Sequence, residues 1–301
     1  MKDKKQSIKT VVTAYMKKIG IVNIILLVMF ILSWGGVFIV GDVLGAALWV
    51  LIKFVFPMFG IILLIVNIII LLKKKRKDQF IKRTIAFVMS IAYLFPILLL
   101  MQIIPMSYPA NRNTVKPAVT VHWPLMGETV VGWGGDTFTD NYHTEWAASR
   151  WAYDLVMKPY GNGSPKLSDY GIWESQIISP VNGTIIAVYD DEEDISPNRD
   201  EFLSQEGNYI YIRIEETGTY LLLNHLRQDS VVVSAGERVV VGDLLGLVGN
   251  SGMSSEPHLH IHHQRQDPTR IIHPLIAEGL PLYFYNAENI IFPTKGQIIT
   301  P

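Results

Sequence analysis

The residues best suited to chemistry are three histidines at alternate positions, His258, His260 and His262. Leu259 and Ile261 lie between them and are apolar, which is typical of a β-strand. Successive side chains of a strand point to opposite faces, so the three imidazoles share one face. Neutral imidazole is the commonest metal ligand, and a buried row of imidazoles without partners is costly. We therefore interpret this strand as part of a metal site. The alternation alone also permits a solvated polar strand face.

The composition restricts which other groups could hold a metal. The 301 residues include no cysteine, which excludes a disulfide framework, a cysteine nucleophile and cysteine-ligated zinc. A metal in this chain must therefore be held by histidine and carboxylate. The net charge of −1 gives no indication of a nucleic-acid partner, and none is expected.

The histidine strand follows a turn rich in glycine and serine, and the whole stretch reads GNSGMSSEPHLHIHHQ over residues 249–264. This stretch resembles the C-terminal signature of the lysostaphin-type (LytM-like) zinc metallopeptidases, which cut peptide bonds in peptidoglycan. The resemblance implies that His260 is a zinc ligand and that His258 is a catalytic residue. It also implies the mainly-β LytM-like fold, sometimes called the duplicated hybrid motif.

A catalytic zinc usually has three protein ligands, so two more must be found upstream. The family's H-x-x-x-D motif supplies them, and Asp154 in the sequence WAYDL fits its aspartate. Arg150 stands four residues earlier, where the family has histidine, and a guanidinium cannot bind a metal. His143 is the nearest imidazole upstream, and we predict that it completes the site. His262 is the rival, but alternate strand residues lie about 7 Å apart, which disfavours two ligands from one strand face.

A further histidine, His225 in the sequence LNHL, resembles a histidine–leucine pair that the family carries after a strand. The resemblance implies that His225 and His258 flank the metal, polarise the attacking water and stabilise the oxyanion. A histidine hydrogen-bonded at a strand end is the alternative for His225. The remaining histidines have no motif around them and are interpreted as structural or surface residues: His122, His263 and His273.

The first third of the chain is apolar and predicts three transmembrane helices. A basic segment at 1–20 precedes apolar runs at about 21–40, 50–72 and 85–106. Each run is close to the roughly 20 residues needed to cross a bilayer. Basic residues also cluster at 73–83, between the second and third runs. The positive-inside rule then places the N-terminus in the cytoplasm and the chain after the third helix outside.

The rest of the chain predicts an extracytoplasmic β domain. Residues 107–124 are rich in proline and asparagine and predict a linker. Residues 125–301 alternate short apolar runs with turn signals, which favours a mainly-β domain. The predicted strands are 151–157, 176–189, 209–215, 219–226, 230–233, 244–248 and 258–263.

Together these features predict a multi-pass membrane protein whose outward-facing domain is a zinc metalloendopeptidase. The predicted ligands are His143, Asp154 and His260, and the predicted catalytic residues are His225 and His258. The resemblance implies that the substrate is the peptide part of peptidoglycan. Two alternatives stay open: an inactive LytM-like scaffold or regulator of other wall enzymes, and a zinc enzyme that acts on a secreted protein or peptide.

Overall fold

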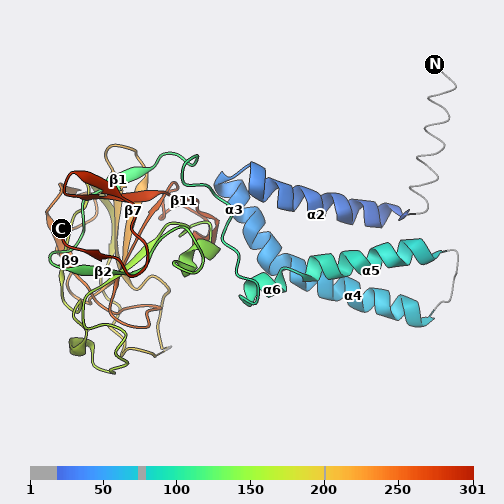
Figure 1. Cartoon of the computed structure of the whole chain (residues 1–301), viewed down its shortest axis with the longest axis horizontal. Helices are drawn as coiled ribbons and strands as arrows, with labels where there is room; N and C mark the ends of the chain where they lie inside the picture. The colour runs from blue at the N-terminus through green and yellow to red at the C-terminus, as the bar shows by residue number, and fades with distance from the viewer. Residues whose placement is uncertain (1–18, 74–78, 200) are drawn as a thin grey trace, which may run out of the picture. The chain divides into compact units, whose positions relative to one another are not determined.

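The computed structural model describes residues 19–73, 79–199 and 201–301. It divides the chain into two compact units, Met1–Met106 and Ser107–Pro301 (Figure 1). The first is helical and the second is mainly β, which confirms the predicted fold class. Most of the predicted basic N-terminal segment and part of the basic loop, residues 74–78, lie outside the described residues.

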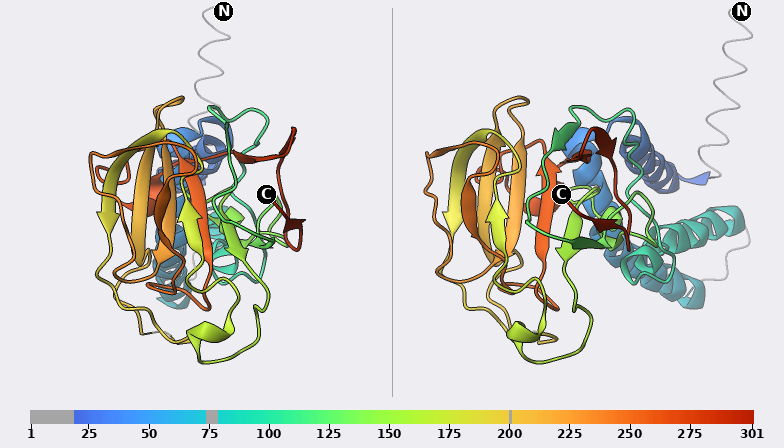
Figure 2. Two further views of the ribbon diagram at one scale, coloured as in Figure 1. Left: turned by 90° about the vertical axis from the view of Figure 1, so that its left-hand side faces the viewer. Right: turned by 60° about the vertical axis from the view of Figure 1, so that its left-hand side comes forward.

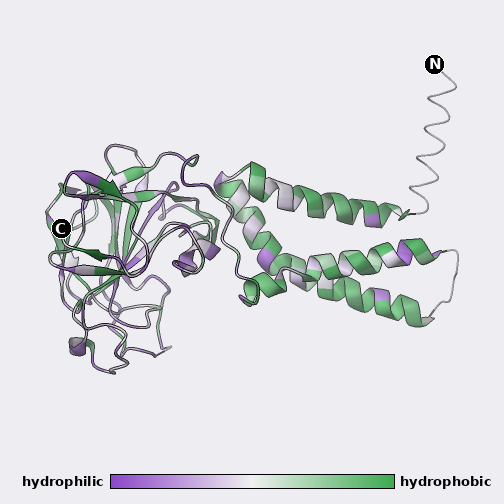
Figure 3. Cartoon of the chain, viewed as in Figure 1, coloured by the Kyte–Doolittle hydropathy of each residue, from purple (hydrophilic) through white to green (hydrophobic). Residues whose placement is uncertain are grey.

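The first unit contains three helical stretches that are long and apolar enough to cross a membrane, Ile21–Ile39, Asp42–Leu72 and Phe80–Leu100. Figure 3 shows how apolar side chains dominate along all three. The elements are α2 (Ile21–Ile39), α3 (Asp42–Val50), η1 (Leu51–Val55), α4 (Phe56–Lys73), α5 (Phe80–Leu94) and α6 (Ile97–Leu100).

Two prolines account for the irregularities in these stretches. Pro57 has no N–H to donate to the carbonyl four residues earlier, and the wide π-helical turn η1 precedes it. The helix expected at 50–72 therefore continues through this turn and begins at Asp42. Pro96 follows α5, which ends at Leu94, and it likewise has no N–H to donate to the carbonyl four residues earlier.

The second unit is built on one large antiparallel sheet (Figures 1 and 2). Its strand order is β14-β2-β3-β10-β7-β6-β5-β8, and β11 also pairs with β10. Strands β3, β10 and β7 lie side by side in the middle of this order, where the chemistry-bearing residues are found. The bounds are β14 (Ile298–Ile299), β2 (Thr129–Trp133), β3 (Tyr153–Val156), β10 (Leu259–Gln264), β7 (Tyr220–Leu226), β6 (Asn208–Ile214), β5 (Gly183–Tyr189), β8 (Arg238–Val239) and β11 (Gly279–Leu280).

Smaller elements complete the second unit. β4 (Gln176–Ile178) pairs with β9 (Leu244–Leu247), and β1 (Val119–Val121) pairs in parallel with β12 (Leu282–Asn286), which also pairs with β13 (Asn289–Ile291). Short 3₁₀ turns are η3 (Tyr142–Glu145), η4 (Leu167–Asp169) and η5 (Pro274–Ile276). The segment expected to be a linker, 107–124, thus contains strand β1 and belongs to the second compact unit.

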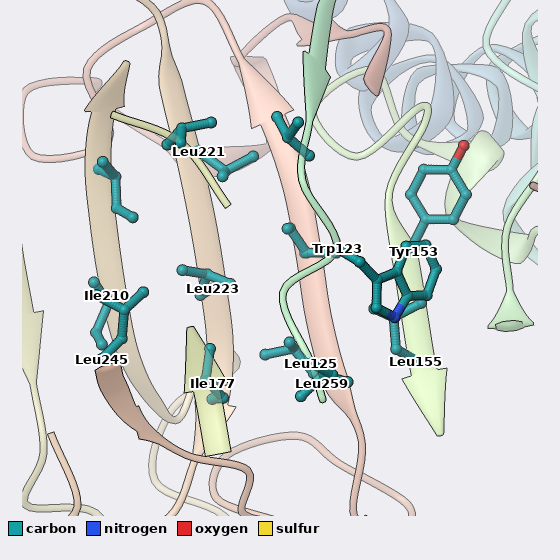
Figure 4. Close-up of a cluster of buried hydrophobic side chains, with 14 of the residues drawn as sticks. Trp123, Leu125, Tyr153, Leu155, Ile177, Ile210, Leu221, Leu223, Leu245 and Leu259 are labelled. Carbon is teal, nitrogen blue, oxygen red and sulfur yellow. The ribbon is translucent and has the colours of Figure 1, made fainter. Parts of the chain in front are cut away.

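The hydrophobic core covers one face of the large sheet. Figure 4 shows Leu221, Leu223 and Leu259 from neighbouring strands in one buried cluster with Ile177 and Leu245 from the small sheet. All five side chains are fully buried. Because side chains alternate along each strand, packing this face fixes which residues point to the other face. His260 and its alternate neighbours are therefore turned away from the leucine core.

The strand expected at 230–233 is absent from the described elements, and this prediction was wrong. The N–H groups of Ser230 and Val231 donate to the carboxylate of Asp190, at 3.3 and 3.0 Å. Val232 donates to the carbonyl of Leu245 at 3.0 Å. Valine favours strands. Here, however, the N–H of Val231 is bonded to a side chain and that of Val232 to strand β9, so no regular ladder of backbone hydrogen bonds forms.

Candidate metal centre

The sheet register brings Asp154 and His260 together although they lie far apart in the sequence. Asp154 on β3 is the direct antiparallel partner of His260 on β10, and His260 is also the partner of Asn224 on β7. Directly opposed residues of an antiparallel pair point to the same face. Asp154 Oδ1 consequently lies 2.9 Å from His260 Nδ1.

His143 reaches the same carboxylate from the 3₁₀ turn η3. The side chain of Asn141 caps this turn, because its Oδ1 accepts the N–H of His143 at 3.2 Å. The amide of Asn141 also donates to the carbonyl of Ala152 at 3.0 Å, which ties the turn to the start of β3. His143 Nε2 lies 3.0 Å from Asp154 Oδ1. One capping residue therefore brings an imidazole eleven positions upstream back beside the carboxylate.

His143, Asp154 and His260 form a compact buried cluster. Their candidate ligand atoms all lie within 4.8 Å of one another. Burial by itself would raise the pKa of Asp154, but the neighbouring imidazoles of His143 and His258 hold that pKa well below its usual range. Asp154 is therefore an ionised carboxylate whose side chain is almost fully buried. Two imidazoles and one carboxylate are a known ligand set for catalytic zinc.

A chain of hydrogen bonds behind His260 fixes which of its nitrogens carries the proton. The amide of Gln264 donates to the carbonyl of Gln266 at 2.7 Å, so Gln264 presents Oε1 to His262 Nε2 at 3.3 Å. Since an amide oxygen only accepts, His262 carries its proton on Nε2 and has a lone pair on Nδ1. His260 Nε2 lies 2.9 Å from that lone pair and must donate to it.

The lone pair of His260 Nδ1 then faces the carboxylate of Asp154. Burial lowers the pKa of His260 in spite of that carboxylate, so its neutral form is favoured. Two acceptors at 2.9 Å repel one another unless a cation lies beside both. His143 Nε2 is also buried and, although Asp154 Oδ1 lies 3.0 Å away, it makes no well-aligned hydrogen bond within the described part of the chain. The residues therefore fit a bound metal ion better than an empty pocket.

His225 and His258 lie next to this cluster and share one arrangement. His225 Nδ1 donates to the carbonyl of Ser251 at 2.8 Å, and His258 Nδ1 donates to the carbonyl of Glu256 at 2.8 Å. Because a carbonyl only accepts, the neutral form of each imidazole has its lone pair on Nε2. The two ring centroids are 4.8 Å apart, and His258 Nε2 lies 3.6 Å from Asp154 Oδ1.

His225 is held in an unusual backbone conformation. Its φ is +64°, in the left-handed region that non-glycine residues rarely adopt, and such strain is concentrated at functional sites. Burial lowers the pKa of His225 well below its usual range, and the imidazoles of His258 and His260 lower it further. His225 is therefore neutral at pH 7 and can accept a proton at Nε2.

Tyr142 and Lys295 also lie at the site, and no sequence motif selects either of them. Tyr142 donates its hydroxyl to Asp154 Oδ2 at 3.0 Å, and its position next to His143 was the only clue. A cavity of about 700 Å³ opens beside the cluster, lined in part by Trp133, Tyr142, His258 and Lys295. The ammonium of Lys295 lies over the Trp133 ring, 3.1 Å from its centroid. The end of strand β2, at Gly132 and Trp133, thus lines this cavity.

The other candidates lie away from the cluster. Arg150 directs its guanidinium to Tyr108 and Asp136, and His263 contacts Thr219 and Pro281. His122 packs against the ring of Tyr285. His273 caps the turn η5 by accepting the N–H of Leu275.

Comparison with known proteins gives a family match over part of the chain. Residues 171–271 match the model of peptidase family M23. A search of curated protein sequences finds no match. Solved structures give only distant similarities, and the chain spans about half or less of the longer ones.

The catalytic domain of lysostaphin from Staphylococcus simulans is 16% identical, with 51% of this chain and 88% of that chain covered and a TM-score of 0.31. Full-length lysostaphin is 16% identical, with 54% and 53% covered and a TM-score of 0.32. A zinc-containing peptidase from Vibrio cholerae is 18% identical, with 49% and 35% covered and a TM-score of 0.26.

The matched segment includes strands β5 to β10 and therefore His225, His258 and His260, while His143 and Asp154 lie before it. The match agrees with the resemblance seen in the histidine motif. Over residues 171–271 this domain is therefore similar to peptidase family M23.

Proposed function

We propose that the second unit is a zinc metalloendopeptidase whose ion is held by His143, Asp154 and His260. The observation that carries this proposal is the lone pair of His260 Nδ1 directed at an ionised carboxylate 2.9 Å away. That arrangement is stable when a cation is shared by both groups and repulsive when it is not. Zinc, when bound, would supply a water with a pKa near 7 and would polarise the scissile carbonyl.

Within this proposal, His225 and His258 are the catalytic residues. Each has its Nδ1 proton committed to a backbone carbonyl, which orients the ring and leaves the Nε2 lone pair free. Such a nitrogen accepts a proton from an attacking water and later returns it to the leaving amine. In the protonated form the same groups stabilise negative charge on the carbonyl oxygen. The hydroxyl of Tyr142 holds the second oxygen of Asp154 and so orients the carboxylate.

The proposed substrate is the peptide part of peptidoglycan, and support for this comes from the family match and the histidine motif. The cavity beside the cluster offers aromatic surface and a lysine, which suits a peptide with a negatively charged group. An inactive scaffold was favoured by one observation, the arginine that replaces the family's first histidine. That observation loses its force because the Arg150 guanidinium is bonded to Tyr108 and Asp136, while an imidazole from His143 lies at the carboxylate.

The three apolar helices are proposed to cross the membrane, with the N-terminus in the cytoplasm and the second unit outside. Support comes from the length of the helices and from the basic residues before the first and between the second and third. Protease added to intact, wall-stripped cells should remove the chain after about residue 107. Full protection of the second unit would contradict this topology and the wall substrate together.

The enzymatic proposal is tested with the full chain purified in detergent. Incubation with purified peptidoglycan should release new amino termini, and removal of zinc by a chelator should stop the release. Asp154→Ala is the matched inactive variant. A wild-type protein that binds zinc but releases no amines from wall, while it cleaves a secreted protein or peptide, would transfer the proposal to that substrate class. A wild-type protein that binds no zinc would favour the scaffold.

A further inference from the structure

Arg150 is a buried arginine that makes no contact with the groups assigned to metal or catalysis. Its side chain is almost fully buried. Nε donates to the carbonyl of Tyr108 at 2.8 Å, and Nη2 contacts Asp136 Oδ1 at 2.9 Å. The indole of Trp151 donates to the same carboxylate oxygen at 2.9 Å. The guanidinium thus joins the loop at Asp136 to Tyr108, which lies 42 residues before Arg150 in the chain.

The segment that Arg150 holds is attached to the residue after His143. Tyr108 donates its N–H to the carbonyl of Thr144 at 2.7 Å. The hydroxyl of Ser107 lies 2.8 Å from the hydroxyl of Thr144. Tyr108 and Thr144 are both buried, so these bonds are shielded from competing water. His143 therefore lies between two anchored neighbours, Thr144 on one side and the capping residue Asn141 on the other.

A turn of this kind needs outside support to keep its geometry. The turn η3 has four residues, Tyr142–Glu145, and 3₁₀ hydrogen bonds are weaker than those of an α-helix. A ligand that is displaced by a fraction of an ångström binds its metal less well, and supporting contacts decide that position. In this molecule Thr144 is bonded to Ser107 and Tyr108, the first residues of the second unit.

We propose that Arg150 is a positioning residue for the metal centre: it fixes Ser107–Tyr108 against Thr144 and thereby holds the imidazole of His143 at Asp154. The inference rests on the proposed function, because it needs His143 to be a ligand. It also assigns a role to the segment 107–108, which joins the apolar helices to the second unit. An arginine suits this role because one planar fork can bond a carbonyl and a carboxylate at once, whereas a lysine ammonium is a single point charge.

The test compares zinc affinity of the full chain in detergent, measured by competition with a chelator. Arg150→Lys keeps the positive charge beside Asp136 but cannot bridge to Tyr108. We expect zinc affinity to fall about 10- to 100-fold, the usual effect of losing a group that orients a ligand. X-ray absorption at the zinc edge should count one imidazole in this variant and two in the wild type.

The chain offers a matched control in Arg265. Its guanidinium also donates to a backbone carbonyl in the segment that begins the second unit, that of Lys116, and pairs with Glu278. Arg265→Lys loosens the segment at a point away from Thr144, so zinc affinity should stay as in the wild type. An equal loss in both arginine variants would overturn the proposal, because it would reveal a general effect of loosening the segment.

A milder variant guards against misfolding of the arginine variant. Thr144→Val keeps the shape of the side chain and removes the contact with Ser107. One hydrogen bond corresponds to about a 2- to 10-fold loss of zinc affinity. The loss should be smaller in the Arg150→Lys background, because both changes release the same contact.

The outcomes separate this inference from the proposed function. Unchanged zinc affinity in Arg150→Lys, together with zinc loss in Asp154→Ala, would overturn the positioning role and leave the zinc centre standing. Weaker zinc binding that still shows two imidazoles would also overturn it. A wild-type chain that binds no zinc would overturn both.

Discussion

The two faces of strand β10 carry buried histidines with opposite surroundings. On one face, His263 lies 2.6 Å from the hydroxyl of Thr219 and 3.2 Å from the carbonyl of Pro281, so both ring nitrogens have partners within the chain. On the other face, His260 has a partner for Nε2 in His262, while Nδ1 faces the carboxylate of Asp154. The strand therefore buries His263 with partners for both ring nitrogens and His260 with one nitrogen directed at a carboxylate.

This difference shows how a structural histidine can be distinguished from a functional one when both are buried. Burial alone does not distinguish them, because all the histidines of β10 are buried. The hydrogen-bond inventory does distinguish them, since a neutral imidazole has one donor and one acceptor to satisfy. The two ring nitrogens of His263 are bonded to a hydroxyl and a carbonyl. In His260 one ring nitrogen is bonded to His262, and the other faces the carboxylate of Asp154.

The largest expected effect comes from removing a ligand on the metal-binding face. His143→Ala and Asp154→Ala should each lose most of the bound zinc and all measurable hydrolysis, because two protein ligands bind zinc weakly. Zinc content per chain and release of amino termini measure the two effects. His263→Gln, on the other face, should retain zinc. Intact zinc binding and hydrolysis in His143→Ala would show that this imidazole is not a ligand.

The next effect separates catalysis from metal binding. His225→Ala and His258→Ala should keep near-stoichiometric zinc while kcat/KM falls about 10²- to 10⁴-fold, the contribution of a general acid–base group. Each removes an Nε2 lone pair beside the cluster without removing a proposed ligand. Loss of zinc in the His258 variant would mean that the roles of His258 and His260 are reversed.

A smaller effect should come from the hydrogen-bond chain behind His260. His262→Leu removes the acceptor for His260 Nε2–H, so the orientation of the ring and its lone pair is no longer fixed. Zinc affinity should fall about 10- to 100-fold, as measured by chelator competition. Gln264→Leu should weaken binding in the same direction. If neither variant changes zinc affinity, the protonation pattern inferred for the chain is incorrect.

The smallest effect concerns His263 and the stability of the fold. Burial lowers the pKa of His263 from 6.5 to about 4. The unfolded state therefore takes up a proton first, and stability that is complete above pH 6.5 is lost as pH falls towards 4. The loss at pH 5.5 is about 1.4 kcal/mol, equivalent to one pKa unit.

Urea unfolding of the metal-free protein at pH 7.5 and 5.5 measures this loss against His263→Gln, which lacks the titrating ring. The variant should lose less stability than the wild type over this interval. An equal loss in both proteins would mean that His263 titrates normally in the folded state.

Much of the site could be predicted from the sequence because its residues lie in short regular patterns. Alternation on β10 separates the face of His260 from the core, and Asp154 in the sequence WAYDL fits the aspartate of the H-x-x-x-D motif. His143 was selected because the chain offers no better ligand near Asp154. The structure places its Nε2 3.0 Å from that carboxylate, and its role as ligand stays a prediction.

The remaining contacts depend on pairings that no local pattern encodes. The bond from Arg150 to Tyr108 spans 42 positions and joins two segments of irregular structure. The proline and asparagine content of residues 107–124 predicts a linker. These residue types indicate extended backbone, but they do not indicate what that backbone binds. The hydroxyl of Tyr142 and the lysine over Trp133 are likewise visible only once the loops are in place.

The central claim is that a zinc ion lies between the two histidines and the aspartate, and anomalous diffraction at the zinc edge from crystals of the full chain tests it most directly. We expect an anomalous peak bonded to His143 Nε2, His260 Nδ1 and Asp154, with nitrogen distances of about 2.0–2.1 Å. His262 should lie behind His260 and make no bond to the ion. A peak bonded to His262 or His225 in place of His143, or no peak beside Asp154 in zinc-loaded crystals, would contradict the account.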